Sequence, residues 1–540
     1  MIAEVVGKTW DVIIIGTGIG GGTIGRRLAE KGLSVLFVEK GPFGPRAEQQ
    51  RLRSDVEDPY ARLVRGYWPK PLHATIDGRS SLHFGPVGAG VGGSSVFYAA
   101  TLERPERHDI DNSETRRHPA GGWPERYDTF VPYFEDAERI YNVCGTDDPL
   151  STEAPSNLMP PPELADGDRA MMATLQRQGL HPYQIHLAVR FLPECTRCFG
   201  YKCPRACKMD ARSAGVEPAL KTGNAYVLDM CEVKAIRGNG NRISYLEAEK
   251  GGETITLRAK RYVLSAGGLG SPRLLLGSRS ADWPDGCSNG SGLVGRNLMF
   301  HLTEMIAIWP ERRAQFDGPT RALAMRDFYF DGGRRFGSLQ AIGVDATYGE
   351  IVHYLNNIFD RSALRNIKPL RPMLRIPSFI AARLFGKAKV FAGIIEDLPY
   401  QHNRVVLDDA DPDRLCFEYQ VSPELRERRN EFRKLIKRRL RGQRSVFLTF
   451  QPELNFAHAC GTLRFGDDPA TSVLDRNCQS HDVQNLYVVD ASFMPTSLGI
   501  NPSLMIAANA LRVADRLFDG LRLAATSTQD REAFYAAPKP

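Results

Sequence analysis

The chain lacks any apolar run long enough to cross a membrane, although 42% of its 540 residues are hydrophobic. A transmembrane helix needs about 18 or more consecutive apolar residues. The amino terminus, MIAEVVGKTW, has no basic segment followed by an apolar core and a cleavage site, so no signal peptide is evident. Ten cysteines in 540 residues are ordinary for an intracellular enzyme with reduced thiols. These absences predict a cytoplasmic protein.

The sequence also lacks a nucleic-acid-binding module. Its net charge is +7, but the positive charge is concentrated in two segments. Residues 361–389 contain eight Lys or Arg and no acid, and residues 426–444 contain ten Lys or Arg and two acids. No groove-binding motif and no basic strand interleaved with aromatic residues accompanies them. We therefore expect no nucleic-acid partner.

The two basic segments differ in pattern. Residues 361–389 mix Leu, Ile and Phe with Arg and Lys, as a surface that docks peripherally on an anionic bilayer does. A cover for a pocket and a solvated insertion are the alternatives. Residues 426–444 continue a helix that begins near Pro423, and their apolar positions on one face predict core packing with a solvated basic face.

A strand–helix–strand pattern opens the chain, which is long enough for two or three domains. Residues 11–15 are a short apolar strand, residues 23–31 have a helical pattern, and residues 34–38 are a second strand. This is the context that a dinucleotide-binding fingerprint requires.

The fingerprint itself consists of Gly16, Gly18 and Gly21 after the first strand and Glu39 after the second. The first glycine makes the turn, the second lets the backbone approach a pyrophosphate, and the third lets the helix pack on the strand. The acid accepts a hydrogen bond from a ribose hydroxyl. These residues predict an ADP-containing cofactor, without distinguishing FAD from NAD.

A second glycine-rich loop, residues 85–96, includes Gly92, Gly93 and Ser94. Such a loop lets the backbone approach another group closely. A flexible hairpin tip is the alternative. Because the fingerprint already requires a bound pyrophosphate, we predict a second cofactor contact here.

The carboxyl-terminal block contains an apolar strand, residues 486–489, that ends in Asp490. Asn501 has the chemistry of a helix N-cap, and Pro502 suits the first helical position. The pattern predicts a helix from this point to about Phe518, whose positive end faces an anion or an electron-rich ring.

Four motifs together resemble the glucose-methanol-choline (GMC) flavoprotein oxidoreductases. They are GTGIGGG near the start, GPVGAGVGGSS near residue 90, SAGGLGSPRLLL at 265–276, and the closing block from His458 through NLYVVDASFMPTSLGINPSLMIAANAL. The motifs run in family order from residue 11 to residue 518. The closing block is most similar to the His/Asn branch, which includes cholesterol oxidases and bacterial sugar and aminoglycoside oxidoreductases.

The resemblance implies an α/β protein with a Rossmann-like FAD-binding domain and a substrate-binding domain built on a largely antiparallel sheet. The FAD-binding domain is expected to be discontinuous, and its segments are 1–105, 209–300 and 450–525. The substrate-binding domain takes 106–208 and 301–449, with 361–389 as a basic insertion. Residues 526–540 are expected to form a loose tail.

The resemblance also implies where FAD binds. The pyrophosphate would lie over the three fingerprint glycines and the ribose on Glu39, with Val233 contacting adenine. The residues expected near the flavin, the ribityl chain or the pyrophosphate are Gly92, Gly93, Ser94, Asp490 and Pro502.

His458 and Asn501 are the implied catalytic pair. A neutral imidazole at His458 would take the alcohol proton while hydride leaves for flavin N5, and Asn501 would hydrogen-bond the substrate oxygen. The expected substrate is an alcohol, a sugar or a sterol-like molecule, and the electron acceptor is oxygen, a quinone or another carrier.

Two other functions stay open. A pyridine-nucleotide disulfide reductase would use Cys195 and Cys198, although no second NAD-binding fingerprint is visible. A non-catalytic flavin-binding membrane adaptor would use residues 361–389.

Four cysteines gather at Cys195, Cys198, Cys203 and Cys207. Four convergent thiolates can bind zinc or an iron–sulfur cluster. Their spacing matches neither a second CxxC pair nor the bacterial ferredoxin run. We predict a structural loop with one disulfide and no metal site.

Overall fold

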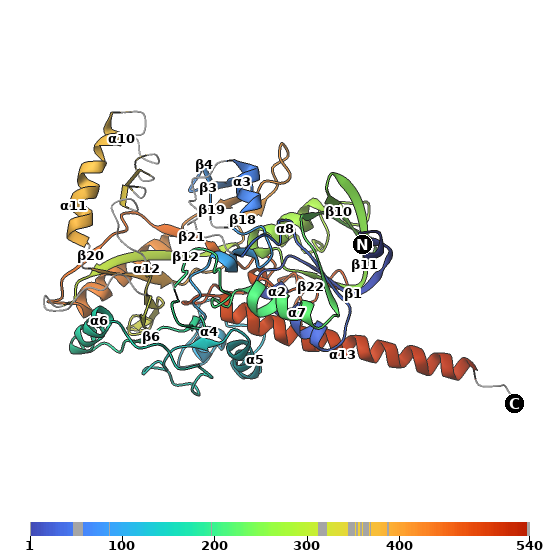
Figure 1. Ribbon diagram of the computed structural model, residues 1–540, viewed down its shortest axis with the longest axis horizontal. Helices are drawn as coiled ribbons and strands as arrows, with labels where there is room; N and C mark the ends of the chain where they lie inside the picture. Colours follow the sequence, from blue (N-terminus) through green and yellow to red (C-terminus); the bar gives the residue numbers. More distant parts are fainter. Residues whose placement is uncertain are drawn as a thin grey trace.

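The computed structural model describes residues 2–46, 58–85, 87–195, 197–310, 321–343, 351–352, 355–356, 359, 367, 369–385 and 388–536. Figure 1 shows an elongated molecule with one sheet around β1 and β11 and another around β12. A long carboxyl-terminal helix runs along one side and projects beyond the first sheet. The functional cavity lies where residues from the two sheets meet.

The first sheet has seven strands in the order β8-β2-β1-β11-β10-β9, with β22 paired to β11. The pairs among β8, β2, β1, β11 and β22 are parallel, whereas β9, β10 and β11 pair antiparallel. Strand β2 is buried along its whole length, as expected for parallel strands covered on both faces. The strands are β1 (Thr9–Ile15), β2 (Val35–Val38), β8 (Ala225–Leu228), β9 (Cys231–Asn239), β10 (Arg242–Lys250), β11 (Glu253–Leu264) and β22 (Leu486–Val488).

Helices pack around this sheet. Helix α2 (Ile19–Glu30) connects β1 to β2, and α13 (Ser503–Ala536) packs against both α2 and α5 (Tyr127–Ile140). Helix α8 (Gly267–Gly277) follows β11 directly. The amino-terminal ends of α2, α8 and α13 all contribute residues to the wall of the cavity.

The second sheet also has seven strands, in the order β20-β12-β17-β16-β13-β6, with β21 paired to β12. All of its pairings are antiparallel. Helix α12 (Pro423–Arg439) packs against it, and Phe432 contacts the backbone at Gly393. The strands are β6 (Tyr183–Gln184), β12 (Met299–Ile308), β13 (Leu323–Met325), β16 (Leu339–Ala341), β17 (Lys389–Ile395), β20 (Ser445–Phe447) and β21 (Glu453–Cys460).

A four-stranded sheet joins distant parts of the chain in the order β18-β19-β3-β4. Its strands are β3 (Leu72–Ile76), β4 (Arg79–His83), β18 (Arg404–Val406) and β19 (Cys416–Tyr419). Two short pairs complete the strands, β5 (Val143–Cys144) with β7 (Leu187–Ala188), and β14 (Phe330–Asp331) with β15 (Arg334–Arg335).

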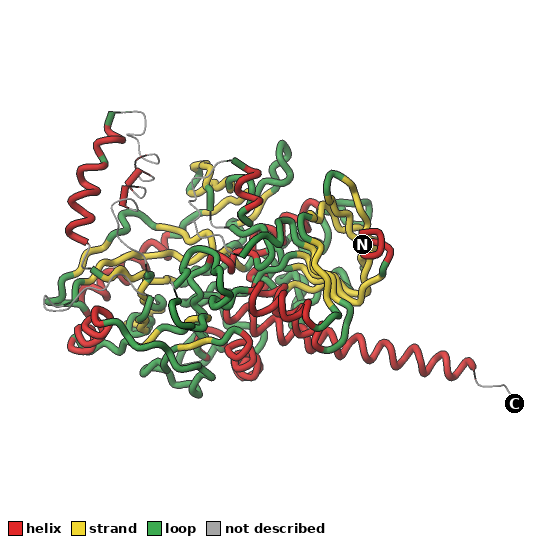
Figure 2. The backbone as a smooth tube through the Cα atoms, viewed as in Figure 1, coloured by secondary structure: helices red, strands yellow, loops and turns green. Residues whose placement is uncertain are grey.

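The other helices are short. They are α1 (Ile2–Gly7), α3 (Pro59–Val64), η1 (Gly93–Phe97), α4 (Arg107–Ile110), α6 (Asp166–Arg177), η2 (Arg212–Val216), α7 (Glu217–Lys221), α10 (Leu370–Met373), α11 (Arg375–Phe385) and η3 (Ala491–Phe493). Figure 2 shows α10 and α11 projecting from the end of the molecule that carries the second sheet.

The predicted fold class is confirmed, with a mixed first sheet and an antiparallel second sheet. The carboxyl-terminal helix, however, does not end near Phe518 but continues to Ala536. The tail expected at 526–540 stays a prediction. The domain boundaries stay a prediction. Strand β3 pairs with β19, and β21 pairs with β12, so both of these sheets cross the predicted boundaries.

The contact between α2 and β2 gives the first prediction. A Cβ atom on Gly25 would overlap the ring of Phe37 and lie 2.9 Å from Cδ1 of Ile14. Both neighbours are fully buried, so the ring has no free space to occupy. We expect Gly25→Ala to lower the free energy of unfolding by about 1–3 kcal/mol, measured by urea denaturation.

Gly277→Ala is the matched control, because a Cβ atom at this helical position meets no described atom within 4 Å. A Gly25→Ala protein as stable as the control would show that the helix is not held against the strand as described.

Candidate functional site

A cavity of about 1230 Å³ is lined by residues of both large sheets. On one side are the β1–α2 turn, the start of α8 and Val233 of β9. On the other side are residues of β12, β17 and β21. The segment 490–506 contributes to the wall between them.

The glycine-rich turn after β1 forms a backbone cradle in this wall. Gly16 has φ +93°, and a Cβ atom there would collide with the Ser265 carbonyl. Gly18 is the N-cap residue of α2 and has open space where a side chain would project. Gly93 packs so closely that its Cβ atom would lie 2.9 Å from the Gly18 Cα atom. The backbone amides at the start of α2 are therefore available to an anion in the cavity.

Two of the predicted cofactor residues do not line the cavity. Gly21 packs against the Gly16 carbonyl, where any side chain would collide. Gly92 has φ +102° and donates its amide hydrogen to Thr17 Oγ1 over 3.1 Å. Both residues hold the backbone of the two glycine-rich loops in place without lining the cavity, because only glycine tolerates these positions.

Glu39 lies in the cavity wall with its carboxylate buried. The amide and the hydroxyl of Thr17 donate to Oε2 over 3.1 and 2.6 Å, and the Gly41 amide donates to Oε1 over 3.2 Å. Burial raises the pKa of Glu39 to about 7, because these bonds offset only part of the desolvation cost.

The remaining predicted cofactor residues lie around the same cavity. Ser94, Val233, Asp490 and Pro502 all line it. Asp490 also accepts hydrogen bonds from the amides of Gly267 and Ser492, at 3.0 and 2.9 Å. Its carboxylate thus ties α8 and η3 together beneath the cavity.

His458 lies in β21 and part of its side chain is accessible from the cavity. Its Nδ1 atom is 2.8 Å from Nδ1 of His301 and 3.3 Å from Nδ2 of Asn455. Burial, His301 and the Arg321 guanidinium together hold the pKa of His458 well below its usual range. The imidazole is therefore neutral at neutral pH.

Asn501 lines the cavity as well and is held by a chain of side-chain hydrogen bonds. Nη2 of Arg321 donates to Oε1 of Gln340 over 2.9 Å, and Nε2 of Gln340 donates to Oδ1 of Asn501 over 2.8 Å. Because a guanidinium only donates, these bonds fix the orientation of both amides. The Nδ2 group of Asn501 is then the donor available to the cavity.

The expected N-cap role of Asn501 is wrong. Helix α13 begins at Ser503, and the first helical hydrogen bond in this turn joins the Ile506 amide to the Pro502 carbonyl. The side-chain Oδ1 atom of Asn501 accepts from Gln340 instead, because the neighbouring strand β16 offers a buried donor.

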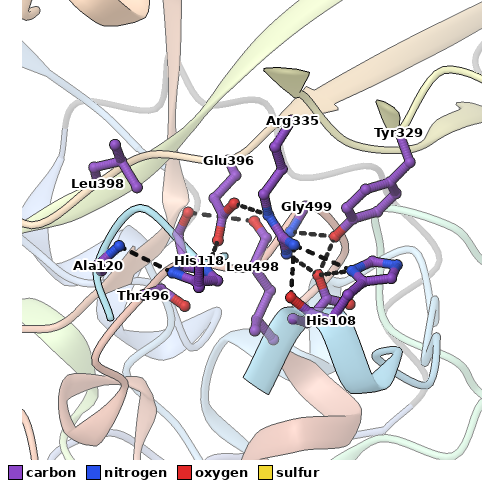
Figure 3. A network of polar contacts seen from close by, with 12 residues as sticks. His108, His118, Ala120, Tyr329, Arg335, Glu396, Leu398, Thr496, Leu498 and Gly499 are labelled. Carbon is purple, nitrogen blue, oxygen red and sulfur yellow. Dashed lines mark hydrogen bonds and ion pairs between the residues drawn. The ribbon is translucent and has the colours of Figure 1, made fainter. Parts of the chain in front are cut away.

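A buried ion network holds the turn just before this helix. Arg335 pairs with both Asp109 and Glu396. Tyr329 donates its hydroxyl to Asp109 and accepts the Gly499 amide over 2.8 Å. Figure 3 shows Arg335, Glu396 and Tyr329 gathered beside Leu498 and Gly499 of the turn. The position of the turn therefore depends on charges far away in the sequence.

Comparison with known proteins decides the family. Two models of the GMC oxidoreductases match residues 11–303 and 399–510.

The chain belongs to the GMC oxidoreductase family.

Curated relatives of this GMC oxidoreductase include paromamine 6'-oxidase of Streptomyces fradiae, which is 29% identical over 94% of this chain and 91% of its own length. The large subunit of fructose dehydrogenase of Gluconobacter japonicus is 26% identical over 95% of this chain and 98% of its own length.

Solved structures share the fold. Pyridoxine 4-oxidase from Mesorbium loti superposes with a TM-score of 0.60 at 21% identity, covering 94% of this chain and 99% of that chain. A formate oxidase from Aspergillus oryzae gives a TM-score of 0.63 at 15% identity, covering 95% and 98%.

This GMC oxidoreductase is accordingly an FAD-dependent enzyme that oxidises CH–OH groups. The lining residues fit that cofactor. Ser265 Oγ is buried in the wall beside Gly20 and has no hydrogen-bond partner among the described residues. An unpartnered hydroxyl, a backbone cradle and a buried carboxylate match the polar groups that a dinucleotide offers.

The comparisons support neither a disulfide reductase nor a non-catalytic adaptor. The expected disulfide is also wrong, because none of the ten cysteines forms a disulfide bond. The Sγ atoms of Cys203 and Cys207 are 3.4 Å apart, well beyond the bonded distance of about 2.05 Å. The absence of a metal site in this loop stays a prediction.

The cysteine loop is instead held by a buried lysine. Nζ of Lys208 has at most three hydrogens to donate, and it lies within hydrogen-bond distance of four backbone carbonyl oxygens. They are those of Val96, Tyr98, Cys198 and Tyr201, at 2.9, 3.3, 3.0 and 2.6 Å. These bonds join the cysteine loop to the second glycine loop. Phe199 and Gly200 consequently form part of the cavity wall.

Three site residues were missed by sequence reasoning: His301, Arg321 and Gln340. His301 lies directly between two apolar residues in the strand MFHLTEMIAI, and Gln340 does so in the strand LQA. A polar side chain inside an apolar strand is the signal that could have identified them, since such residues are buried only with partners.

Glu39 gives a prediction about pH. The folded protein favours the protonated carboxyl, so in cofactor-free protein its stabilising effect is complete below pH of about 4.5 and is lost as the pH rises through about 7. Relative to Glu39→Gln, the wild type should lose about 3 kcal/mol of unfolding free energy between pH 4.5 and pH 8. Urea denaturation across this range measures it.

The exposed Glu114→Gln is the control and should follow the wild type at every pH. Parallel pH profiles for wild type and Glu39→Gln would rule out the burial described for Glu39.

Proposed function

We propose that this GMC oxidoreductase oxidises an alcohol or sugar hydroxyl with His458 as the base and Asn501 as the hydrogen-bond donor. The observation that carries the proposal is the pair of complementary groups on one cavity: a neutral imidazole and an amide whose NH2 group is available. An alcohol oxygen needs both, because it donates its own hydrogen and accepts another.

The proton transfer follows from these residues. The substrate O–H bond breaks and the proton passes to Nε2 of His458, while Asn501 holds the oxygen. FAD, when bound, accepts the hydride that leaves the carbinol carbon. The low pKa of His458 keeps its base form available at neutral pH.

We assign the cofactor contacts from the same lining. The pyrophosphate is proposed to lie over Gly16 and Gly18 at the start of α2, the ribose on Glu39, and the adenine beside Val233. Ser94, Asp490 and Pro502 border the flavin side. The proposal is supported by the positions of these residues in the cavity wall.

The substrate class is proposed from the relatives. Their names describe action on paromamine, on fructose and on 2-methyl-1,2-propanediol. We propose a neutral polyol, a sugar or a small alcohol for this chain, with electrons passing to oxygen, a quinone or another carrier.

We propose further that this is a cytoplasmic enzyme with peripheral contact to an anionic bilayer. Helices α10 and α11 expose large apolar side chains at Met373, Ile376, Phe379 and Ile380. The last three recur at helical spacing on one face. Arg375 and Arg383 are exposed on the same helix, as expected for docking on anionic lipid.

The second basic segment adjoins this helix. The ring of Phe385 lies 5.7 Å from that of Trp309, and the Arg444 guanidinium lies 4.3 Å above Trp309. Exposed Lys437, Arg439 and Arg441 belong to the same segment. Residues 361–366, 368 and 386–387 of the expected insertion lie outside the described residues. Lys389 is not surface charge, because it is buried and pairs with Asp168 over 3.0 Å.

None of the described helices combines the length and apolar character that crossing a bilayer requires.

His458→Ala tests the proposed base. The variant should retain FAD but reduce its flavin about 10²- to 10⁴-fold more slowly, because it lacks the proposed proton acceptor. Anaerobic stopped-flow bleaching with a panel of alcohols and sugars measures this step, and added imidazole should restore part of the rate.

The control is His402→Ala, which removes an exposed histidine that stacks on Tyr400. If His458→Ala bleaches as quickly as this control, His458 is not the base and the proposed chemistry is wrong.

Substitution of the apolar helix face tests the membrane contact. The triple variant Ile376→Ser, Phe379→Ser, Ile380→Ser should lose binding to phosphatidylcholine vesicles that contain phosphatidylglycerol. Wild-type protein should sediment with these vesicles, less so at high salt, and not with pure phosphatidylcholine. Co-sedimentation measures both.

The matched control is Tyr60→Ser, Leu82→Ser, Met159→Ser, which removes three exposed apolar side chains elsewhere. Wild-type protein that stays in the supernatant, or equal pelleting of both triple variants, would exclude this surface as a membrane contact.

A further inference from the structure

His301 is a fully buried histidine that touches His458 from behind the cavity. The rings meet edge to face, with centroids 4.9 Å apart and planes at 88°. Nδ1 of His301 lies 2.8 Å from Nδ1 of His458, and Nε2 of His301 lies 2.9 Å from the Leu498 carbonyl oxygen. Each nitrogen of this ring therefore has one partner.

The Leu498 carbonyl decides which nitrogen of His301 carries hydrogen. A carbonyl oxygen can only accept, so Nε2 of His301 must be the donor. Burial lowers the pKa of His301 to about 4, despite the opposing effects of the Leu498 carbonyl and the Glu396 carboxylate. The ring is thus neutral at neutral pH and carries a single N–H. Its Nδ1 atom is then an acceptor.

This assignment fixes the tautomer of His458. Since Nδ1 of His301 accepts, Nδ1 of His458 must donate to it. The amide of Asn455 is the competing neighbour of this Nδ1 atom, but its contact of 3.3 Å is longer than the 2.8 Å between the rings. A neutral His458 with hydrogen on Nδ1 has its lone pair on Nε2. Nε2 of His458 has no hydrogen-bond partner among the described residues.

We infer that His301 is a positioning residue that holds His458 in the Nδ1–H tautomer, with the Nε2 lone pair directed to the substrate proton. The inference rests on the proposed role of His458. In the other tautomer Nε2 would carry hydrogen and could not accept the alcohol proton. A base held in the wrong tautomer loses activity even when its position is unchanged.

The Leu498 carbonyl can serve as an anchor because its turn is held rigidly. Leu498 has φ +64°, a left-handed conformation that is uncommon for a branched residue. Its neighbour Gly499 donates to Tyr329 over 2.8 Å and accepts the Ser338 amide over 2.9 Å. The side chains of Figure 3 surround this turn.

The test compares two substitutions at one position. His301→Asn keeps an acceptor near the place of Nδ1, because its Oδ1 atom can accept from His458. His301→Leu removes the acceptor at similar volume. We expect kcat to fall on the order of 10²-fold in His301→Leu, with a smaller change in KM, and to recover at least tenfold in His301→Asn.

A spectroscopic measurement reads the tautomer directly. Protein labelled with ¹⁵N-histidine, with and without FAD, should show His458 as a neutral ring protonated at Nδ1, assigned by loss of its signals in His458→Ala. In His301→Leu the Nε2-protonated form should appear. Thermal unfolding and FAD content should be closely similar in the two His301 variants, which separates positioning from general loss of structure.

The outcomes separate this inference from the proposed function. If His458→Ala loses flavin reduction but His301→Leu keeps the wild-type rate and tautomer, the role of His301 is refuted and that of His458 stands. If His458→Ala reduces flavin normally, the proposed function fails whatever the tautomer. Equal kcat in His301→Leu and His301→Asn would also overturn the inference.

Discussion

The carbonyl oxygen of Leu498 can only accept a hydrogen bond. Which nitrogens of His301 and His458 donate and which accept depends on this oxygen. It makes Nε2 of His301 a donor, which makes Nδ1 of His301 an acceptor. Nδ1 of His458 must then donate to His301, which leaves Nε2 of His458 as an acceptor facing the cavity. A backbone group thus determines the protonation pattern of two imidazoles.

The turn that carries this carbonyl is itself under strain. A non-glycine residue in the left-handed region costs about 1–3 kcal/mol and persists only where surrounding structure enforces it. Here the enforcement is electrostatic. Burial raises the pKa of Glu396, but Arg335 and His118 outweigh that effect and hold the pKa at about 2. Both carboxylates bonded to Arg335 stay ionised at neutral pH, and breaking such a buried pair costs about 3–5 kcal/mol. The network can therefore sustain the strained turn.

The cofactor side of the cavity could be predicted from the sequence because its signals are local. The strand, the glycines and Glu39 lie within one short segment, and each requirement is a backbone or spacing requirement. The substrate side could not. His301 meets His458 across 157 positions, and Gln340 meets Asn501 across 161. No spacing rule connects such pairs. The N-cap prediction for Asn501 failed for the same reason, since the competing donor comes from a distant strand.

A bulge between β12 and β21 explains how His458 reaches both its partner and the cavity. Met299 is opposite Cys460, whereas His301 is opposite Asn455. Strand β12 advances by two residues while β21 advances by five, so the extra residues of β21, which include His458, are not paired in regular register. A bulge turns side chains away from the regular alternation of a strand. In a regular ladder continued from Met299, His458 would lie directly opposite His301 as an ordinary cross-strand pair. The irregularity thus lets one imidazole contact a buried ring and the cavity at once.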